Sequence, residues 1–276
     1  MFKRHIHWFV FLSFLLLLLA AAYLLSMPNL SKLKKENPKK TALMEYRKKE
    51  LREKGRKLRI HQSWVSYSKI SPYLIKAVLI AEDDKFWNHE GFDYEAIQKA
   101  IEKNLKAKKF KFGGSTITQQ LARNLFLSPE KSLTRKIFEA VITWRMEKAL
   151  SKRRILELYL NVAEWGEGIF GAEAASRHYF GIPSSELNAE EAARLASVLP
   201  NPRKYNPAGD QRYVINRSDV ICSIMIRRGI VIPEYQEVTE SIESSSPEGT
   251  VPEETVLEEN VSDAPISKEE DGTEGR

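Results

Sequence analysis

A long uncharged segment near the amino terminus constrains this chain most. Residues 8–31 contain no charged side chain, and their Leu-rich part, residues 8–25, is 18 residues long. That length is close to the roughly 20 residues with which a helix crosses a bilayer. Small side chains at 20–22 also fit the cleavage site of a signal peptide. We favour an uncleaved anchor over residues 1–31, because the apolar run continues through residues 23–25.

Charge divides the rest of the chain into three parts. Residues 32–59 carry 13 Lys or Arg and four Glu, which predicts a juxtamembrane stalk near anionic head groups or, equally well, a solvated linker. Residues 233–276 carry 14 acidic and two basic residues with few large apolar ones, which predicts a disordered acidic tail. One basic domain, residues 60–232, is left between them.

Helical periodicity dominates residues 60–232. An apolar face follows Ser71 and Pro72, a typical helix start with proline in the first turn. Alternating β-branched runs are almost absent, so the sequence predicts a mostly α fold. Further helices are expected over residues 94–106, 116–124, 132–150, 152–161, 171–179, 188–199 and 213–228.

The first candidate functional residue is Glu82, which follows the apolar residues 78–81. Apolar surroundings raise the pKa of a carboxyl group and make it a better proton acceptor. An ordinary acidic side chain at a helix end is the alternative interpretation. We expect structural hydrogen bonds for His89, because no second His, Cys or spaced acidic set completes a zinc-like site. Cys222, among apolar neighbours, is expected to be buried and unreactive.

Two further segments could bind an anion. Glycines at 113 and 114 precede a helix start whose free N–H groups suit a phosphate, although Thr116 and Gln119 also fit a capping box. Farther along, Arg135 and Lys136 share a helical face with Glu139. They predict either a surface ion pair or a phosphate contact oriented by the carboxylate.

Together these segments resemble the peptidoglycan glycosyltransferases, the lysozyme-like family that polymerises lipid II. The resemblance runs from about Trp64 to Met225, and residues 161–166 and 199–202 look like its monofunctional biosynthetic branch. We expect no transpeptidase domain after residue 230. The matching blocks are Glu82-Asp83 with Phe86, His89 and Gly91; Gly113 to Gln120; Arg135-Lys136 with Glu139; Arg154-Ile155-Leu156 leading to Tyr159-Leu160-Asn161; and Gly171 to Ala175 before Tyr179-Phe180-Gly181.

The resemblance implies a lysozyme-like glycosyltransferase domain in which Glu82 deprotonates the 4-hydroxyl of the acceptor lipid II. Attack on C1 of the growing chain then releases undecaprenyl diphosphate and forms a β-1,4 bond with inversion. Glu139 would be the second catalytic carboxylate, which positions substrate and cations. The implied substrate-binding residues are Asp83, Gly114, Ser115, Thr116, Gln119, Gln120, Arg123, Asn124, Lys131, Arg135 and Lys136.

Some features depart from the family pattern or go beyond it. Lys131 stands where the family often has arginine, and Arg123 where it often has lysine, so charge is kept while hydrogen-bond geometry changes. The acidic tail is outside the pattern. No cofactor is expected to be obligatory and no metal ligands are assigned, although Mg²⁺ or Mn²⁺ would assist a departing diphosphate. Phe110, Phe112 and Phe126 are candidates for an apolar surface that enters the bilayer.

The expected partners are lipid II, the growing glycan strand and the bilayer, with other cell-wall synthesis proteins as candidates and no nucleic acid. The domain is expected on the periplasmic or outer face of the bacterial inner membrane, behind a single-pass anchor. This overrules charge counting, because the five lysines within residues 32–40 favour a domain inside the cell. The rival functions are a lytic enzyme of lysozyme type and a membrane scaffold with a decayed site, and the intact blocks oppose decay.

Overall fold

The computed structural model describes residues 8, 11, 12, 14, 15, 28–107, 113–130 and 132–230. Most of the expected anchor and the whole of the expected acidic tail lie outside the described residues, so both stay predictions. Among the residues that are described, no helix has the length and hydrophobicity needed to cross a bilayer.

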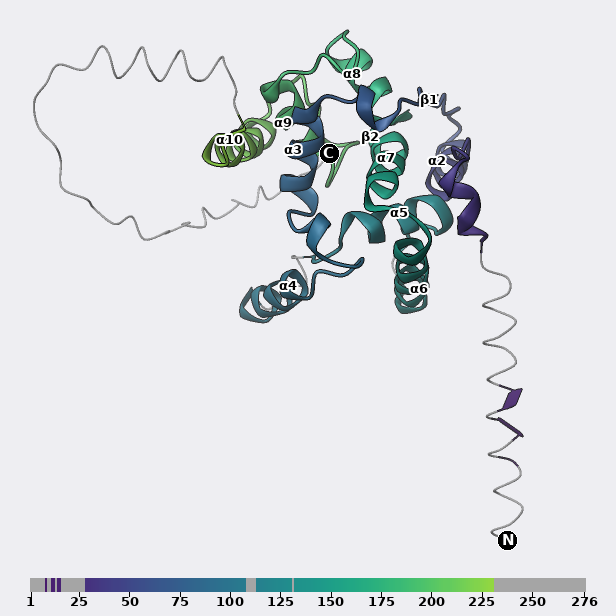
Figure 1. Ribbon diagram of the computed structural model, residues 1–276. Helices are drawn as coiled ribbons and strands as arrows, with labels where there is room; N and C mark the ends of the chain where they lie inside the picture. The colour runs from purple at the N-terminus through teal and green to yellow at the C-terminus, as the bar shows by residue number, and fades with distance from the viewer. Residues whose placement is uncertain are drawn as a thin grey trace, which may run out of the picture. The chain divides into compact units, whose positions relative to one another are not determined.

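Helices make up most of the described unit (Figure 1). The helices expected from the sequence are confirmed, and so is the mostly α fold class. Their bounds are α3 (Pro72–Glu82), α4 (Tyr94–Ala107), α5 (Ile117–Phe126), α6 (Leu133–Ala149), α7 (Lys152–Val162), α8 (Ala172–Tyr179), α9 (Ala189–Val198) and α10 (Arg212–Arg227). The described part also contains α2 (Ala42–Glu53) and the short 3-10 helices η1 (Leu30–Lys34), η2 (Tyr67–Lys69) and η3 (Phe86–Asn88).

Side-chain caps explain where several of these helices begin. The Ser71 hydroxyl accepts a hydrogen bond from the Tyr73 N–H at 3.2 Å, and Pro72 occupies the first turn, where no N–H is needed. At α5, the Thr116 hydroxyl accepts from the Gln119 N–H, while the Gln119 side chain accepts from the Thr116 N–H. The expected capping box is therefore present, and it fixes the start of α5 directly after the glycine-rich loop.

Two groups of helices share one hydrophobic core. α9 packs against α3 and α10, and α5 packs against α6 and α7. Side chains from both groups, such as Val78, Leu121 and Leu195, belong to the same buried cluster. Cys222 lies in this cluster, and burial raises the pKa of its thiol to about 11. This confirms the expected buried cysteine and keeps it protonated at neutral pH.

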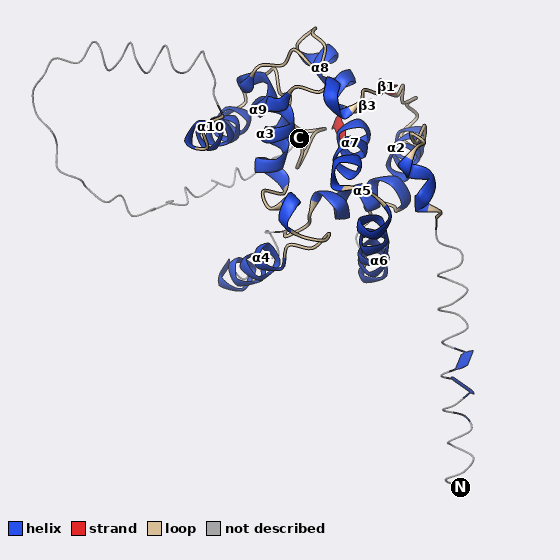
Figure 2. Ribbon diagram, viewed as in Figure 1, coloured by secondary structure: helices blue, strands red, loops and turns tan. Residues whose placement is uncertain are grey.

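A small sheet beside α8 was not predicted (Figure 2). Its strands are β1 (His61–Gln62), β2 (Glu164–Gly166) and β3 (Ile169–Phe170) in the order β1-β3-β2, with β1 parallel and β2 antiparallel to β3. Strands of two or three residues are too short to show an alternating pattern in sequence. Gly171 follows β3 at φ +85°, and a Cβ there would lie 2.7 Å from the Asn161 carbonyl oxygen, so the chain can turn into α8 only at a glycine.

The segment 32–59 belongs to the folded unit, which differs from the stalk expected there. Leu43 and Leu51 of α2 are buried, and α2 packs against α5. The segment before α2 is also attached to the folded unit, because Arg154 Nε of α7 donates a hydrogen bond to the Leu33 carbonyl oxygen at 2.7 Å. The basic side chains around them concealed these few core contacts in the sequence.

Large apolar side chains are exposed on α4 and α6, which lie at the same end of the unit in Figure 1. Among them are Ile101, Leu105, Leu133, Ile137 and Trp144. Phe126, which was expected on a bilayer-facing surface, is instead partly buried against the core. Phe110 and Phe112 lie outside the described residues.

Candidate active site

Glu82 ends α3, and its side chain is only 11% exposed. Its Oε2 accepts a hydrogen bond from Gln120 Nε2 at 2.8 Å, and Arg217 Nη2 lies 3.6 Å from its Oε1. Burial raises the pKa of Glu82 above its usual range, and the Gln120 hydrogen bond and the charges of Arg217 and Arg123 oppose this rise. The direction is the one expected from the apolar residues that precede Glu82.

Gln120 is oriented by Tyr159, a residue of α7 whose exposed fraction is 1%. The Tyr159 hydroxyl donates a hydrogen bond to Gln120 Oε1 at 3.1 Å, so the amide nitrogen of Gln120 faces the Glu82 carboxylate. Tyr159 stood in a recognised sequence block without an assigned role. The structure gives it one, which is to fix the amide that contacts Glu82.

Asp83 joins the end of α3 to the start of α5. Its Oδ2 accepts a hydrogen bond from the Ile117 N–H, and its Oδ1 lies 2.8 Å from His89 Nε2. The Gly91 N–H donates to His89 Nδ1, so the neutral ring carries its proton on Nε2 and donates it to Asp83. The structural role expected for His89 is confirmed. Both oxygens of Asp83, expected to bind substrate, are engaged within the protein.

Glu139 gathers the basic side chains of the site. Its side chain is fully buried, with Arg135 Nη1 and Lys136 Nζ each 2.5 Å from a carboxylate oxygen and Arg123 Nη1 at 3.9 Å. Lys136 Nζ also donates to the Ser115 hydroxyl at 3.1 Å. Burial of the carboxylate rules out a simple surface ion pair, and the arrangement holds three cations beside the glycine-rich loop.

The glycine-rich loop combines structural residues with one that faces open space. A Cβ at Gly114 would lie 2.9 Å from the Ile97 Cα, so glycine allows the loop to approach α4. Thr116 and Gln119 are buried and form the capping box of α5, and Thr116 also borders the pocket beside this loop. Ser115, in contact with Lys136, borders a pocket.

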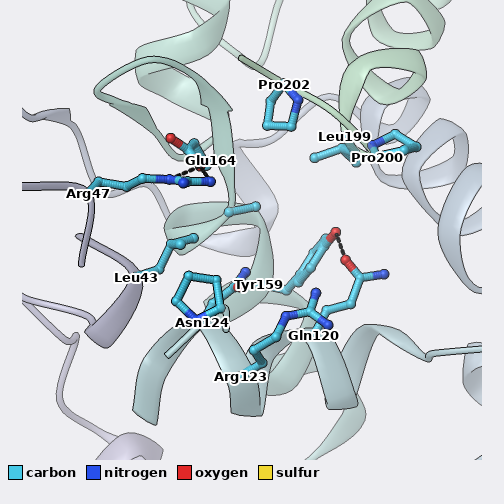
Figure 3. A pocket seen from close by; sticks show the side chains of 12 residues that line it. Leu43, Arg47, Gln120, Arg123, Asn124, Tyr159, Glu164, Leu199, Pro200 and Pro202 are labelled. Atoms are coloured by element: carbon cyan, nitrogen blue, oxygen red, sulfur yellow. Dashed lines mark hydrogen bonds and ion pairs between the residues drawn. The ribbon is translucent and has the colours of Figure 1, made fainter. Parts of the chain in front are cut away.

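Two pockets border the hydrogen bond between Glu82 and Gln120. The first, here called the Ser115 pocket, has a volume of about 230 Å³ and is lined by Glu82, by its neighbours in residues 80–84 and by residues 113–116. The second, called the Arg47 pocket, has a volume of about 170 Å³ (Figure 3). Its polar lining consists of Arg47, Gln120, Arg123, Asn124, Tyr159 and Glu164. Since Glu82 lines one pocket and its partner lines the other, the carboxylate lies between the two.

The expected site residues therefore fall into three sets. Glu82, Gln120, Arg123 and Asn124 meet at the pockets, and Arg135, Lys136, Glu139 and Ser115 form the cationic cluster next to them. Asp83, Gly114, Thr116 and Gln119 shape the backbone that carries them. Lys131 lies outside the described residues.

Three side chains of the site were missed in the sequence: Arg47, Glu164 and Arg217. Each meets its partner across a large sequence separation, 117 positions for Arg47 and Glu164. Arg217 lies on α10 between the buried residues Val214 and Ile221. An arginine within an apolar stripe was the signal that could have found it.

No group of three or more His, Cys, Asp or Glu side chains suited to hold a metal ion occurs in the described part of the chain. The Asp83 oxygens are taken by His89 and Ile117, and Glu139 is taken by its cations. The side chains themselves offer a proton acceptor at Glu82 and positive charge for a departing anion.

Comparisons with known proteins agree with this chemistry. The family model described as Transglycosylase matches residues 48–226. A biosynthetic peptidoglycan transglycosylase of Nitrosospira multiformis is 51% identical over 194 residues, which cover 70% of this chain and 84% of that protein. Proteins of the same name from Dechloromonas aromatica and an Azoarcus species are 55% and 58% identical, over 62% and 61% of this chain and 74% and 73% of their own lengths.

Proposed function

Because the chain belongs to the transglycosylase family, we propose that it polymerises lipid II into β-1,4-linked glycan strands and releases undecaprenyl diphosphate. It is a peptidoglycan glycosyltransferase of bacterial cell-wall synthesis, as the family match and the names of its relatives indicate. One observation carries the detailed proposal: the buried Glu82 carboxylate borders the Ser115 pocket and lies near the charges of Arg123 and Arg217.

In this mechanism the Glu82 carboxylate takes the proton of the acceptor 4-hydroxyl while that oxygen attacks C1 of the donor. The bond from C1 to the diphosphate oxygen breaks as the new C1–O bond forms, so the configuration inverts and the proton ends on Glu82. Diphosphate is a good leaving group that needs positive charge more than a proton donor. Arg123, Arg135 and Lys136, gathered by Glu139, are suited to supply that charge.

We infer that no cofactor is obligatory for this reaction. Mg²⁺ or Mn²⁺ bound to the diphosphate of the substrate would add positive charge at the leaving group. Lys131 is proposed as a further cation for the same group.

The membrane assignment belongs to the proposal as well. A single-pass anchor within residues 1–31 would hold the domain at the periplasmic or outer face of the inner membrane. The apolar side chains exposed on α4 and α6 support contact of these helices with the bilayer surface. The acidic tail is proposed to be disordered and available to other cell-wall synthesis proteins.

Polymerisation and cleavage of glycan are distinguished by two incubations with the full-length protein. With lipid II in detergent or liposomes, we expect glycan polymer to appear on a gel as undecaprenyl diphosphate is released. With purified glycan strands, we expect no shortening. Shortened strands without polymer growth would identify a lytic enzyme of lysozyme type and overturn the proposal.

The pH dependence of the reaction should reflect Glu82. Because the base must be ionised and burial raises its pKa, the acidic limb of kcat/KM should lie above the usual glutamate value of 4.5. Arg217→Met removes a charge that lowers the pKa of Glu82 and should move this limb to higher pH. Arg227→Met, on the exposed side of the same helix, should leave the limb in place. An unchanged limb in folded Arg217→Met would contradict the role of Glu82 as base.

A further inference from the structure

Arg47 brings a cation to the site from a segment that was expected to be a stalk. It lies on α2, one residue before the part of the chain that the family model matches. Its side chain is 21% exposed and lines the Arg47 pocket together with Arg123 and Asn124 of α5. In Figure 3 its guanidinium enters the pocket from the side opposite Gln120 and Arg123.

Two carboxylates, those of Glu164 and Glu50, bind the guanidinium of Arg47. Its Nε and Nη2 each lie 2.9 Å from Glu164 Oε2, and its Nη1 lies 3.0 Å from Glu50 Oε2. Hydrogen bonds from Lys54 and Arg203 hold the pKa of Glu50 at about 2, so this partner stays ionised. A guanidinium has five N–H groups, and these contacts use three of them. Within the described part of the chain, the other two donors have no partner, and the side chain that carries them is held in place.

Burying the carboxylate of Glu164 costs stability, which suggests that this side chain serves a function at its position. Its side chain is 5% exposed, and burial raises the pKa of its carboxyl group above the usual range. Oε2 accepts the hydrogen bond from Arg47 Nε and the ion-pair contact of Nη2, while Oε1 is buried without a hydrogen-bond partner among the described residues. An orphaned buried oxygen destabilises a fold. Glu164, the first residue of β2, nevertheless places its carboxylate where it holds the guanidinium of Arg47.

The lining of the Arg47 pocket suits a neutral sugar better than an anion. Glu164 and Glu50 balance the charge of Arg47 at its end of the pocket, whereas Arg123 lines the opposite end. Leu199, Pro200 and Pro202 supply an apolar wall (Figure 3). The volume of about 170 Å³ equals that of roughly six water molecules, which is the scale of one sugar ring.

We propose that Arg47 is a substrate-binding residue that donates hydrogen bonds to oxygen atoms of one N-acetylated sugar ring of the glycan strand in the Arg47 pocket. Glu164 is the positioning residue that fixes the guanidinium. This inference rests on the proposed function, and it adds a binding residue from outside the region that the family model matches.

The test uses full-length protein and lipid II. Arg47→Lys keeps the charge but loses the planar fork, and Arg47→Gln with Glu164→Gln replaces the ion pair without leaving a buried charge unpaired. Loss of one hydrogen bond from a charged donor should raise KM about tenfold and leave kcat within about threefold. Arg52→Met, on an exposed position of the same helix, is the matched control and should keep the KM of the native protein.

A readout without turnover separates binding from chemistry. In a Glu82→Gln background, the affinity for lipid II in detergent should fall about tenfold when Arg47→Lys is added. If circular dichroism shows that the variant with Arg47→Gln and Glu164→Gln is unfolded, the test relies on Arg47→Lys alone. Native KM and affinity in a folded Arg47→Lys protein would overturn the inference. If the native protein itself fails to polymerise lipid II, the proposed function fails first, so the two failures are distinguishable.

Discussion

Glu82→Gln lowers the rate of lipid II polymerisation by roughly 100- to 10,000-fold, the range that a positioned general base contributes. The amide cannot accept the proton of the acceptor hydroxyl. It still offers an oxygen to Gln120 Nε2, which lies 2.8 Å from the native carboxylate, so the local geometry should persist. The measurement is polymer formed per unit time, with folding checked by circular dichroism.

The control for this variant is Glu90→Gln. Glu90 is an exposed carboxylate paired with Lys148 on the surface, so the same chemical change there should leave activity native. A Glu82→Gln protein with native activity would remove the proposed mechanism altogether.

The same substitution should stabilise the fold at neutral pH. A folded-state pKa above the unfolded value means that protonated Glu82 contributes stability. That contribution is complete below the unfolded pKa and is lost as the pH rises through the folded pKa. Glu82→Gln removes the cost of a buried ionised carboxylate, so its Tm should exceed that of the native protein at pH 7. The difference should shrink as the pH falls toward 4.5.

Glu139→Gln should have the largest effect on stability, about 1–3 kcal/mol, because it leaves the partly buried Arg135 and the more exposed Lys136 without their carboxylate. Arg135 and Lys136 would lose their common partner, and Lys136 would no longer be held against Ser115. Misplacing one such group costs about 100-fold in rate. Denaturant unfolding and the lipid II assay measure the two effects separately.

Two further variants separate stability from catalysis at this cluster. Glu139→Gln with Arg135→Gln removes the carboxylate together with one unpaired cation and should regain part of the stability but not the activity. Lys136→Met keeps the pair of Glu139 with Arg135, and its side chain is 44% exposed in the native protein, so it should lose activity with little loss of stability. Full activity in Lys136→Met would exclude it from the site.

Local signals in the sequence predicted the helices well. Ser71 with Pro72 marked the start of α3, and Thr116 with Gln119 marked the start of α5, because capping is decided within four residues. The position of Glu82 followed from the apolar face before it. These features depend on near neighbours only, so a single sequence contains them.

The parts that escaped prediction depend on distant neighbours. Leu43 and Leu51 of α2 are buried, yet the many charged residues around them suggested a solvated segment. Arg47 lies between these two on the same helix, just as Arg217 lies between buried residues of α10. Both arginines bind carboxylates more than 100 positions away. Only the tertiary fold decides whether a cation in an apolar stripe meets such a partner.

The burial of Leu30 in the core would limit how far the catalytic domain can move from the proposed anchor. Leu30 lies five positions after Leu25, where the Leu-rich run of the proposed anchor ends. A fully extended chain of that length spans at most about 18 Å. Joined to the proposed anchor by so short a linker, the catalytic domain would work in a thin layer above the lipid surface. It would meet its substrates by diffusion in two dimensions and could not follow a strand into the deeper cell wall.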